Sequence, residues 1–403
     1  MTTGRDGRVW GAVRMIIIVH CPYRIRGGED EVVDVETRLM RSYGSRVETI
    51  FFPNLALEAL PAWRQAGCAV WNAEAVRRIR GIVRRHKATI VHVHNTFPAA
   101  SPAVIRAAAR EGGAVVATLH NYRLACVNGL LFRDGRVCEE CLGRLPWRGM
   151  MYGCWRGRPQ SAVVAAMLGL HRVLGTWEEV DIFIALTDFA RERFVAAGLP
   201  AERIRVKPNF LDPDPGPGEN GGGYALFVGR LSPEKGVGTL LRAWSRLGGR
   251  VPLRIIGDGP LRGNVERAAA AIPGIEYLGR KPPQEVYELM GQAAFLVFPS
   301  ECYENFPRVL VEAFAKGLPM VCSGLGSHGS LVEHGHTGLH FRPGDPEDLA
   351  EKVDWMLTHP ERVAEMRREA RREYEEKYTA ARNYEMLMRI YEEAIEHRRS
   401  RTR

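Results

Sequence analysis

The sequence lacks a long hydrophobic run: among its 403 residues, the longest clean apolar stretch is Met15–Val19. A membrane-spanning helix needs about 20 apolar residues, and a secretory signal needs a charged start before a longer apolar core. Cysteine is also scarce, because eight residues in a chain of this length are too few for a disulfide scaffold. These absences predict a protein of the cytoplasm with reduced thiols.

Charge is unevenly distributed along the chain. Residues 1–210 hold 30 Lys and Arg against 19 Asp and Glu, whereas the whole chain holds 56 against 47. The basic excess therefore lies entirely in the first half, which predicts contact with something anionic: a nucleic acid, a membrane surface or a phosphorylated acceptor. An arginine-rich, solvated surface without a partner is the alternative interpretation.

The first half predicts alternating strands and helices after a loose tail at residues 1–14. The apolar run Met15–His20 is typical of a buried strand, and a glycine loop at Arg26–Asp30 and a helical pattern follow it. Alternation of this kind favours a parallel sheet with helices on both faces. Further strands are expected at 48–52, 89–94, 114–120 and 181–186, with helices at 71–86 and 102–111.

A run rich in proline and glycine, Asp212–Gly223, divides the chain, because such a run can form neither a helix interior nor a central strand. The sequence thus predicts two doubly wound α/β domains, at 15–211 and 224–375, with a linker at 212–223. Strands of the second domain are expected at 225–228, 253–256, 276–278, 295–298 and 319–322.

The C-terminal segment repeats apolar residues at helical spacing, from Tyr384 to Ile395. This pattern predicts an amphipathic helix over 376–398 whose apolar stripe packs on one of the domains.

A charged motif leaves the first strand of the second domain. Val228–Gly236 enters a helix and brings Arg230 and Lys235 near its N-terminus. Two cations and free backbone N–H groups suit a diphosphate, whereas exposed charges at a helix entry are the alternative.

The most specific pattern is Pro299–Ala313, in which Glu304 and Glu312 stand eight residues apart. The first falls in a loop after a predicted strand, and the second falls about two turns into the next helix. Carboxylates accept hydrogen bonds from vicinal hydroxyls, so the pair suits a ligand with a sugar at one end and a ribose at the other. Glutamates at such spacing are usually solvated surface, but this pair falls in the cleft predicted between the domains.

These motifs resemble those of the family 4 glycosyltransferases of the glycogen synthase-like, group 1 type, over about residues 15–395. The resemblance implies the GT-B fold, in which two Rossmann-like, doubly wound parallel-sheet domains face each other across a cleft. It is carried by Glu-x7-Glu at Glu304 and Glu312, Gly-Arg-Leu-x-x-x-Lys-Gly at Gly229–Gly236, the glycine loop at Gly27–Gly28, and His120–Asn121.

The resemblance implies transfer of a sugar from a UDP-sugar or GDP-sugar to a glycan or lipid-linked acceptor, with retention of configuration, in cell-surface polysaccharide synthesis. Glu304 would hold the hydroxyls of the donor sugar, and Glu312 would bind the ribose. Arg230 and Lys235 would take the diphosphate. His120 would lie near the transferred sugar and the acceptor.

Backbone groups complete the site that the resemblance implies. Gly27 and Gly28 would let the first domain close on the phosphates, and Asn305 and Phe306 would offer N–H groups to the sugar. The sequence departs from many relatives here, because Pro307 stands where they carry the second glycine of Gly-Phe-Gly, and proline has no N–H.

The implied chemistry needs no cofactor. The charge on the leaving nucleoside diphosphate would be stabilised by Arg230, Lys235 and the glycine-loop amides, without a metal. No carboxylate is an obvious nucleophile, so the acceptor would attack on the face that the diphosphate leaves, and the leaving phosphate would take its proton.

Four of the eight cysteines fall within 29 residues, as Cys126-x11-Cys138-x2-Cys141-x12-Cys154. Four thiolates around a central Cys-x2-Cys match a closed tetrahedral zinc site. We therefore expect structural zinc in an insertion at 121–160; an iron–sulfur cluster and thiols without a metal are the alternatives.

Two other functional classes remain open. A basic zinc module could bind nucleic acid, but this leaves the linker and the cleft motifs unexplained, so no nucleic-acid partner is expected. An NAD-dependent oxidoreductase rests on Gly257–Gly263, which a tight turn explains as well, and Gly27–Gly28 lacks the third glycine. Peripheral contact of the basic first domain with the inner face of the plasma membrane also remains a candidate.

Overall fold

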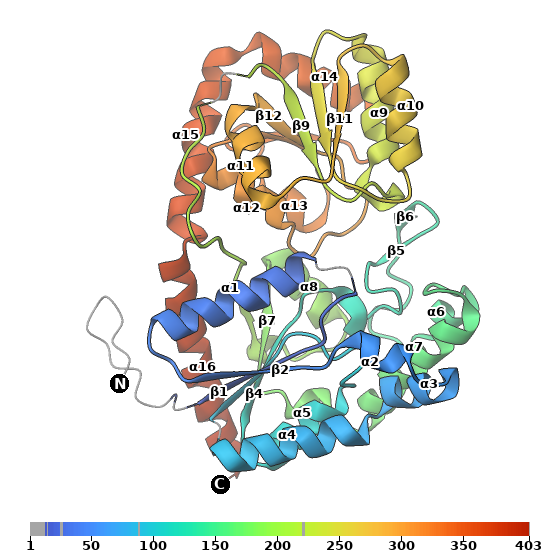
Figure 1. The fold of residues 1–403 in the computed structure, drawn as a ribbon, viewed down its shortest axis with the longest axis vertical. Coiled ribbons are helices and arrows are strands. Elements are labelled where there is room, and N and C mark those ends of the chain that lie inside the picture. Colours follow the sequence, from blue (N-terminus) through green and yellow to red (C-terminus); the bar gives the residue numbers. More distant parts are fainter. Residues whose placement is uncertain (1–12, 14, 25–26, 88, 220–221, 403) are drawn as a thin grey trace. The chain divides into compact units, whose positions relative to one another are not determined.

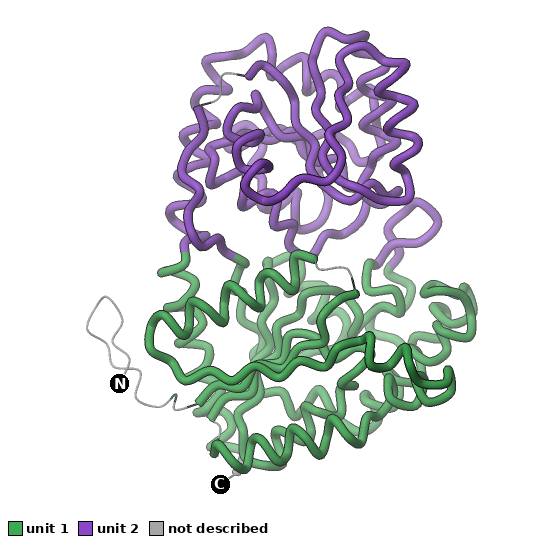
Figure 2. Tube along the Cα trace, in the orientation of Figure 1, with its two compact units in different colours: residues 1–130, 139–209, 380–403 green, residues 131–138, 210–379 purple. Residues whose placement is uncertain are grey.

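The computed structural model describes residues 13, 15–24, 27–87, 89–219 and 222–402, and the chain divides into two compact units (Figure 2). Most of the predicted tail, and Arg26 of the glycine loop, lie outside the described residues. Unit 1 comprises residues 1–130, 139–209 and 380–403, and unit 2 comprises residues 131–138 and 210–379.

Unit 1 is built on a parallel sheet of six strands in the order β2-β1-β3-β4-β7-β8 (Figure 1). The strands β1, β3, β4 and β7 are buried along their whole length, which explains their continuous apolar runs. The order reverses direction between β1 and β3, and the carboxyl ends of strands at such a switch point are where open sheets bind ligands. The strands are β1 (Ile16–His20), β2 (Val47–Phe51), β3 (Ile90–Val93), β4 (Ala114–Thr118), β7 (Ile182–Ala185) and β8 (Ile204–Val206).

Helices cover both faces of this sheet. Helices α1 and α16 contact each other on one face, and α4 and α5 pack together on the other (Figure 1). Helix α7 contacts both α3 and α6. The helices are α1 (Gly28–Ser42), α2 (Asn54–Glu58), α3 (Ala62–Val70), α4 (Ala73–His86), α5 (Ala103–Arg110), α6 (Trp147–Met151), α7 (Arg158–Val173), α8 (Asp188–Ala196) and α16 (Ala380–Thr402), with single turns η1 (Tyr122–Leu124), η2 (Trp177–Glu179) and η3 (Ala201–Arg203).

The predicted C-terminal helix is confirmed as α16, and it belongs to unit 1. Its apolar stripe is buried from Tyr384 to Ile395, and the helix contacts strands β3, β4 and β7. The chain therefore returns to the first sheet after passing through unit 2.

Unit 2 has a second parallel sheet of six strands, in the order β11-β10-β9-β12-β13-β14. Its switch point lies between β9 and β12, as in a Rossmann sheet, so the predicted fold of two doubly wound sheets is confirmed. The strands are β9 (Ala225–Val228), β10 (Leu253–Ile256), β11 (Ile275–Gly279), β12 (Phe295–Phe298), β13 (Met320–Ser323) and β14 (Gly338–Phe341), and a small hairpin pairs β5 (Phe132–Arg133) with β6 (Arg136–Val137).

The core of unit 2 surrounds the fully buried Trp244, whose indole N–H donates to the carbonyl of Val251 at 2.9 Å. Helix α9 packs on α14, and α12 packs on α15. The helices are η4 (Pro233–Lys235), α9 (Val237–Leu247), α10 (Arg262–Ala271), α11 (Pro283–Gln292), α12 (Arg308–Ala315), α13 (Gly326–Leu331), α14 (Pro346–Thr358) and α15 (Pro360–Lys377).

The segment predicted as a linker, 212–223, lies within unit 2, where its described part is held by hydrogen bonds. The amide of Gly218 donates to the carbonyl of Lys316 at 2.9 Å, and the Lys316 ammonium donates to the carbonyl of Pro215 at 3.1 Å. Arg371 pairs with Asp214 at 2.6 Å. Proline and glycine exclude regular structure here, but they do not prevent an extended segment from docking on a domain.

Among the helices that the structure describes, none combines the length and the apolar character needed to cross a lipid bilayer.

Candidate functional site

Two of the predicted motifs meet at the switch point of unit 2. The loop after β9 contacts the loop after β12, because the amide of Glu301 donates to the carbonyl of Glu234 at 2.9 Å. Gly236 has φ +68°, and a Cβ built on it would lie 1.8 Å from the carbonyl oxygen of Pro299. Only glycine permits this approach, so the last residue of the β9 motif sets the position of the Glu304 loop.

Lys235 and Glu304 form an ion pair at this switch point. The Lys235 ammonium lies 2.5 Å from Oε1 of Glu304, and the hydroxyl of Ser300 donates to the same oxygen at 2.7 Å. The two charged side chains are 25% and 13% exposed, so the pair is largely shielded yet open to a ligand.

The pair is ionised. Burial by itself would raise the pKa of the Glu304 carboxyl, but the ammonium of Lys235 and the hydrogen bond from Ser300 outweigh burial and hold this pKa below its ordinary value. Burial would likewise lower the pKa of Lys235, but the carboxylate of Glu304 raises it above its ordinary value. The site therefore offers one fixed carboxylate and one fixed ammonium.

Arg230 is exposed beside the turn at Gly257–Gly259. The amide of Leu231 donates to the carbonyl of Asp258 at 2.9 Å, and a Cβ on Gly257 would lie 1.8 Å from the carbonyl oxygen of Gly229. The two glycines of this turn are thus required for backbone packing, which confirms the tight-turn interpretation.

The remaining residues of the Glu-x7-Glu segment lead into α12. The side chains of Asn305 and Phe306 are buried, and the Phe306 ring packs edge-on against Tyr378 at 6.1 Å. Pro307 is the N-cap of α12. Within that helix Arg308 Nε lies 3.1 Å from Oε1 of Glu312, whose side chain is 16% exposed.

His328, in helix α13 after the neighbouring strand β13, was not among the predicted site residues. Its Nε2 lies 2.8 Å from the hydroxyl of Ser323, and that hydroxyl donates to the carbonyl of Ser300 at 2.6 Å. Burial lowers the pKa of His328 to about 4, so the ring is neutral. The available signal was a histidine a few residues beyond the predicted strand 319–322.

In unit 1, histidines stand at the carboxyl ends of three neighbouring strands. His20 ends β1, His94 follows β3 and His120 follows β4. Nδ1 of His94 lies 2.9 Å from Nε2 of His120. Sequence analysis singled out His120 alone, although the same strand-end position marks the other two.

The glycine loop begins α1 beside His20. The amide of Gly27 donates to Oδ2 of Asp30 at 2.9 Å, and the other oxygen of Asp30 lies 2.9 Å from Nε2 of His20. A Cβ built on Gly27 or Gly28 would meet no atom within 4 Å. The structure around these glycines therefore leaves open space on their Cβ side.

The four clustered cysteines are divided between the two units, with Cys126, Cys141 and Cys154 in unit 1 and Cys138 in unit 2. Zinc–sulfur bonds of about 2.3 Å put the four sulfurs of a zinc site about 3.8 Å apart. Among the described residues, the one group of three or more potential ligands with atoms within 4.8 Å of one another is Glu36, His92 and His94. The thiol of Cys126 donates to the side-chain oxygen of Asn128 at 3.0 Å.

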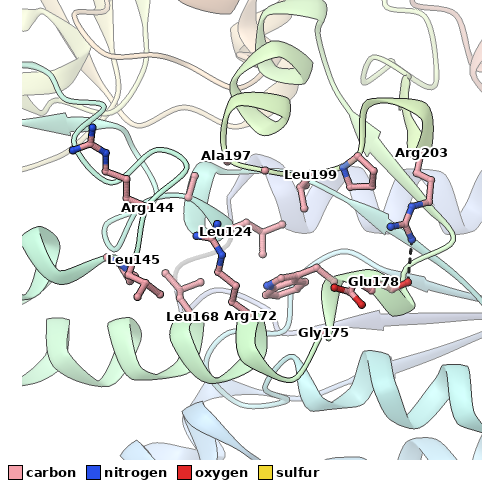
Figure 3. Close-up of a pocket in the computed structure, with 15 residues that line it drawn as sticks. Leu124, Arg144, Leu145, Leu168, Arg172, Gly175, Glu178, Ala197, Leu199 and Arg203 are labelled. Carbon is pink, nitrogen blue, oxygen red and sulfur yellow. Dashed lines mark hydrogen bonds between the residues drawn. The ribbon is translucent and has the colours of Figure 1, made fainter.

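Unit 1 also holds a pocket of about 180 Å³ between α7 and the loop after α8, which no sequence motif indicated (Figure 3). Leu124, Leu168 and Trp177 line its apolar part, and the arginines Arg144 and Arg172 line its edge. We call it the arginine-edged pocket.

Comparison with solved structures places the chain in the GT-B class. HepE from Anabaena, described in complex with UDP and glucose, matches with a TM-score of 0.64 and 16% identity, over 94% of this chain and 98% of that one. Residues 57–215 match the model of Glycosyltransferase Family 4, and residues 215–373 match that of Glycosyl transferases group 1. The two models adjoin and cover most of the chain, which belongs to the family 4 glycosyltransferases.

Curated relatives match over part of their length. D-rhamnosyltransferase WbpZ of Pseudomonas aeruginosa is 34% identical over 161 residues, which are 39% of this chain and 42% of that protein. D-inositol 3-phosphate glycosyltransferase of Rhodococcus erythropolis is 29% identical over 281 residues, 66% of this chain and 60% of that protein. The chain thus spans less than two thirds of the length of these relatives.

Proposed function

We propose that the protein transfers a sugar, with retention of configuration, from a nucleoside-diphosphate sugar to a glycan or lipid-linked acceptor. The observation that carries this proposal is the Lys235–Glu304 ion pair at the β9/β12 switch point of unit 2. The pair sets a cation for a phosphate beside a carboxylate for sugar hydroxyls, where an open sheet binds ligands. The curated relatives named above are glycosyltransferases, which supports the same reaction class.

The residues have distinct chemical tasks in this reaction. Lys235 and the exposed Arg230 stabilise the charge that develops on the leaving diphosphate. Glu304 accepts hydrogen bonds from the hydroxyls of the sugar. The open space beside Gly27 and Gly28 allows a phosphate to approach the amides at the start of α1. The acceptor hydroxyl attacks the sugar on the face from which the diphosphate leaves. The departing phosphate oxygen takes the proton of that hydroxyl.

A screen of nucleotide sugars tests the proposal. We expect UDP or GDP to raise the melting temperature, and one UDP-sugar or GDP-sugar to be hydrolysed or transferred with release of the nucleotide. The anomeric configuration of the product, read by NMR coupling constants, should equal that of the donor. Stabilisation by NAD or a DNA duplex alone, without any turnover of nucleotide sugars, would contradict the proposal.

We further propose that unit 1 contacts anionic membranes, where a lipid-linked acceptor would reside. Trp147 and Met151 on α6 and Val173 at the end of α7 are 60%, 60% and 83% exposed. Exposed aromatic and aliphatic side chains in a basic segment are typical of peripheral membrane contact. The arginine-edged pocket beside α7 also suits an amphiphile with an anionic group.

Co-sedimentation with vesicles checks the membrane contact. We expect binding to vesicles with about one third anionic lipid, weaker binding at high salt, and little binding to neutral vesicles. Trp147→Ser should weaken binding several-fold, whereas Leu357→Ser, at an exposed leucine of α14 in unit 2, should not. Equal binding of both variants would contradict a role for α6.

The four-cysteine zinc site also stays a prediction. Elemental analysis of untagged protein should find about one zinc per chain, and Cys141→Ser should abolish it. Because the segment is rich in arginine and glycine, metal ligation would have to offset its chain entropy. Metal-free protein with full acceptor activity would reduce these cysteines to packing or redox residues.

A further inference from the structure

A buried ion pair lies beneath the histidines of unit 1. The Lys207 ammonium donates to Oε2 of Glu36 at 2.8 Å and to the side-chain oxygen of Asn383 at 3.0 Å. The side chains of Glu36 and Lys207 are each 2% exposed. The other carboxylate oxygen, Oε1, faces Nδ1 of His92 at 3.4 Å and Nε2 of His94 at 3.5 Å. Glu36 is therefore the centre of the cluster.

These side chains do not suit a cation, although three of them could ligate one. Lys207 already supplies the positive charge that balances Glu36. Both ring nitrogens of His92 are also occupied, by the hydroxyls of Tyr391 at 2.8 Å and Thr118 at 2.7 Å. The cluster is a chain of polar contacts rather than a metal site. Hydrogen bonds join Lys207 to Glu36 and His94 to His120, and an electrostatic contact of 3.5 Å joins Glu36 to His94.

The charges of the cluster determine where its protons lie. Burial would raise the pKa of Glu36, but Lys207 outweighs it and keeps this pKa below its ordinary value, so the carboxyl is ionised. Burial lowers the pKa of His94 well below its ordinary value and that of His120 to about 3. Each imidazole is therefore neutral and carries one N–H.

The position of that N–H on His94 follows from its neighbours. Nε2 of His94 makes no hydrogen bond to the described residues, and Oε1 of Glu36 lies 3.5 Å from it. The negative charge of this oxygen attracts an N–H and repels a lone pair, so Nε2 carries the hydrogen. Nδ1 of His94 is then an acceptor, and the ring nitrogen 2.9 Å away, Nε2 of His120, must donate to it. The polarity of the chain therefore runs from His120 through His94 to Glu36.

We infer that Glu36, held by Lys207, acts through His94 as a positioning residue that fixes the tautomer of His120. The Nε2 hydrogen of His120 is committed to His94. Its Nδ1 is then a hydrogen-bond acceptor, and the structure records no hydrogen bond to Nδ1 from the described residues. His120 can accept a hydrogen bond from a hydroxyl but cannot donate one. That this hydroxyl belongs to a substrate rests on the proposed function.

Replacing Glu36 by Gln should reverse the direction in which the hydrogens are donated between His120 and His94. Because Lys207 can only donate, it requires the amide oxygen of Gln at Oε2, which turns the amide nitrogen toward His94. Nε2 of His94 then accepts, its Nδ1 carries the hydrogen, and Nε2 of His120 accepts in turn. The hydrogen of His120 moves to Nδ1, so Nδ1 becomes a donor.

The tautomers can be read directly by two-bond ¹⁵N–¹H correlation NMR on protein labelled at histidine, with His120 assigned from a His120→Gln spectrum. We expect Nε2–H for His120 in the unaltered protein and Nδ1–H in Glu36→Gln. Asp181→Asn is the matched control. Asp181 is another fully buried carboxylate of unit 1, but it pairs with Arg398 and not with the histidines that connect Glu36 to His120. In the Asp181→Asn variant, His120 should keep its hydrogen on Nε2.

An Nδ1–H tautomer in the unaltered protein overturns the inference even if Glu36→Gln fails to fold. An unchanged Nε2–H tautomer in a folded Glu36→Gln variant also overturns it. Kinetics separate this inference from the proposed function. A wrong tautomer alone can slow an enzyme by up to about 10⁴-fold, so we expect Glu36→Gln to lower kcat at least about tenfold with donor KM unchanged. A reversed tautomer with unchanged kcat would support the chain and contradict the placement of His120 at the substrate.

Discussion

Glu304→Gln is expected to lower sugar transfer by about 10³-fold, while the affinity for free UDP or GDP stays within about twofold. The amide keeps the size of the side chain and its contact with Ser300, but it removes the charge that accepts hydrogen bonds from the sugar. Free nucleotide carries no sugar and does not need this carboxylate. Transfer rates and calorimetric nucleotide titrations measure the two effects.

Glu312→Ala should produce the opposite pattern. If Glu312 binds the ribose, removing a charged acceptor should weaken nucleotide binding by about 10- to 100-fold. Glu285→Ala is the control, because Glu285 also pairs with a cation four residues before it, Lys281, but lies on the surface of unit 2. Equal losses of nucleotide affinity in the Glu304 and Glu312 variants would contradict the assignment of the sugar to Glu304 and of the ribose to Glu312.

Lys235→Ala is expected to lower transfer by at least about 10²-fold, because it removes a preorganised charge from the leaving diphosphate. The substitution should have a second effect, because the same ammonium also holds the Glu304 carboxylate in place at 2.5 Å. Arg230→Ala removes only a charge, because Arg230 is exposed. The Lys235 variant should therefore show the larger loss and a lower melting temperature, and the Arg230 variant should melt as the unaltered protein does.

Added EDTA should leave turnover unchanged if the two cations handle the leaving charge. The assay needs a control for the zinc expected at the cysteine cluster, so zinc content is measured before and after chelation. Turnover that disappears with EDTA and returns with magnesium or manganese, at constant zinc, would contradict metal-independent transfer.

Local patterns were sufficient to predict the strands. All ten expected strands are present, because buried parallel strands read as short apolar runs between turn residues. The strands of the small hairpin, β5 and β6, were not predicted, and neither were β8 and β14 of the two large sheets. Both are edge strands, and Ile204–Val206 and Gly338–Phe341 are too short or too polar to be recognised without their neighbours.

The motifs of unit 2 were also readable, because each directly follows a strand at one switch point. The contact between these motifs was not predictable from the sequence. Lys235 and Glu304 are distant in the sequence, and the contact between their loops depends on the close approach of Gly236 to Pro299. The motifs predict ligand-binding roles for both residues, and only the structure shows that the Lys235 ammonium holds the Glu304 carboxylate.

The sequence by itself determined the fold class and the family, because these depend on local periodicity and on motifs of fixed spacing. The tertiary structure decided what long-range contacts control. It placed α16 on the first sheet, docked the segment 212–223 on unit 2, and brought Glu36, His94 and Lys207 together beneath His120. Buried charges such as Glu36 and Lys207 are stable only when each meets its partner, and no local pattern shows which distant residue that partner is.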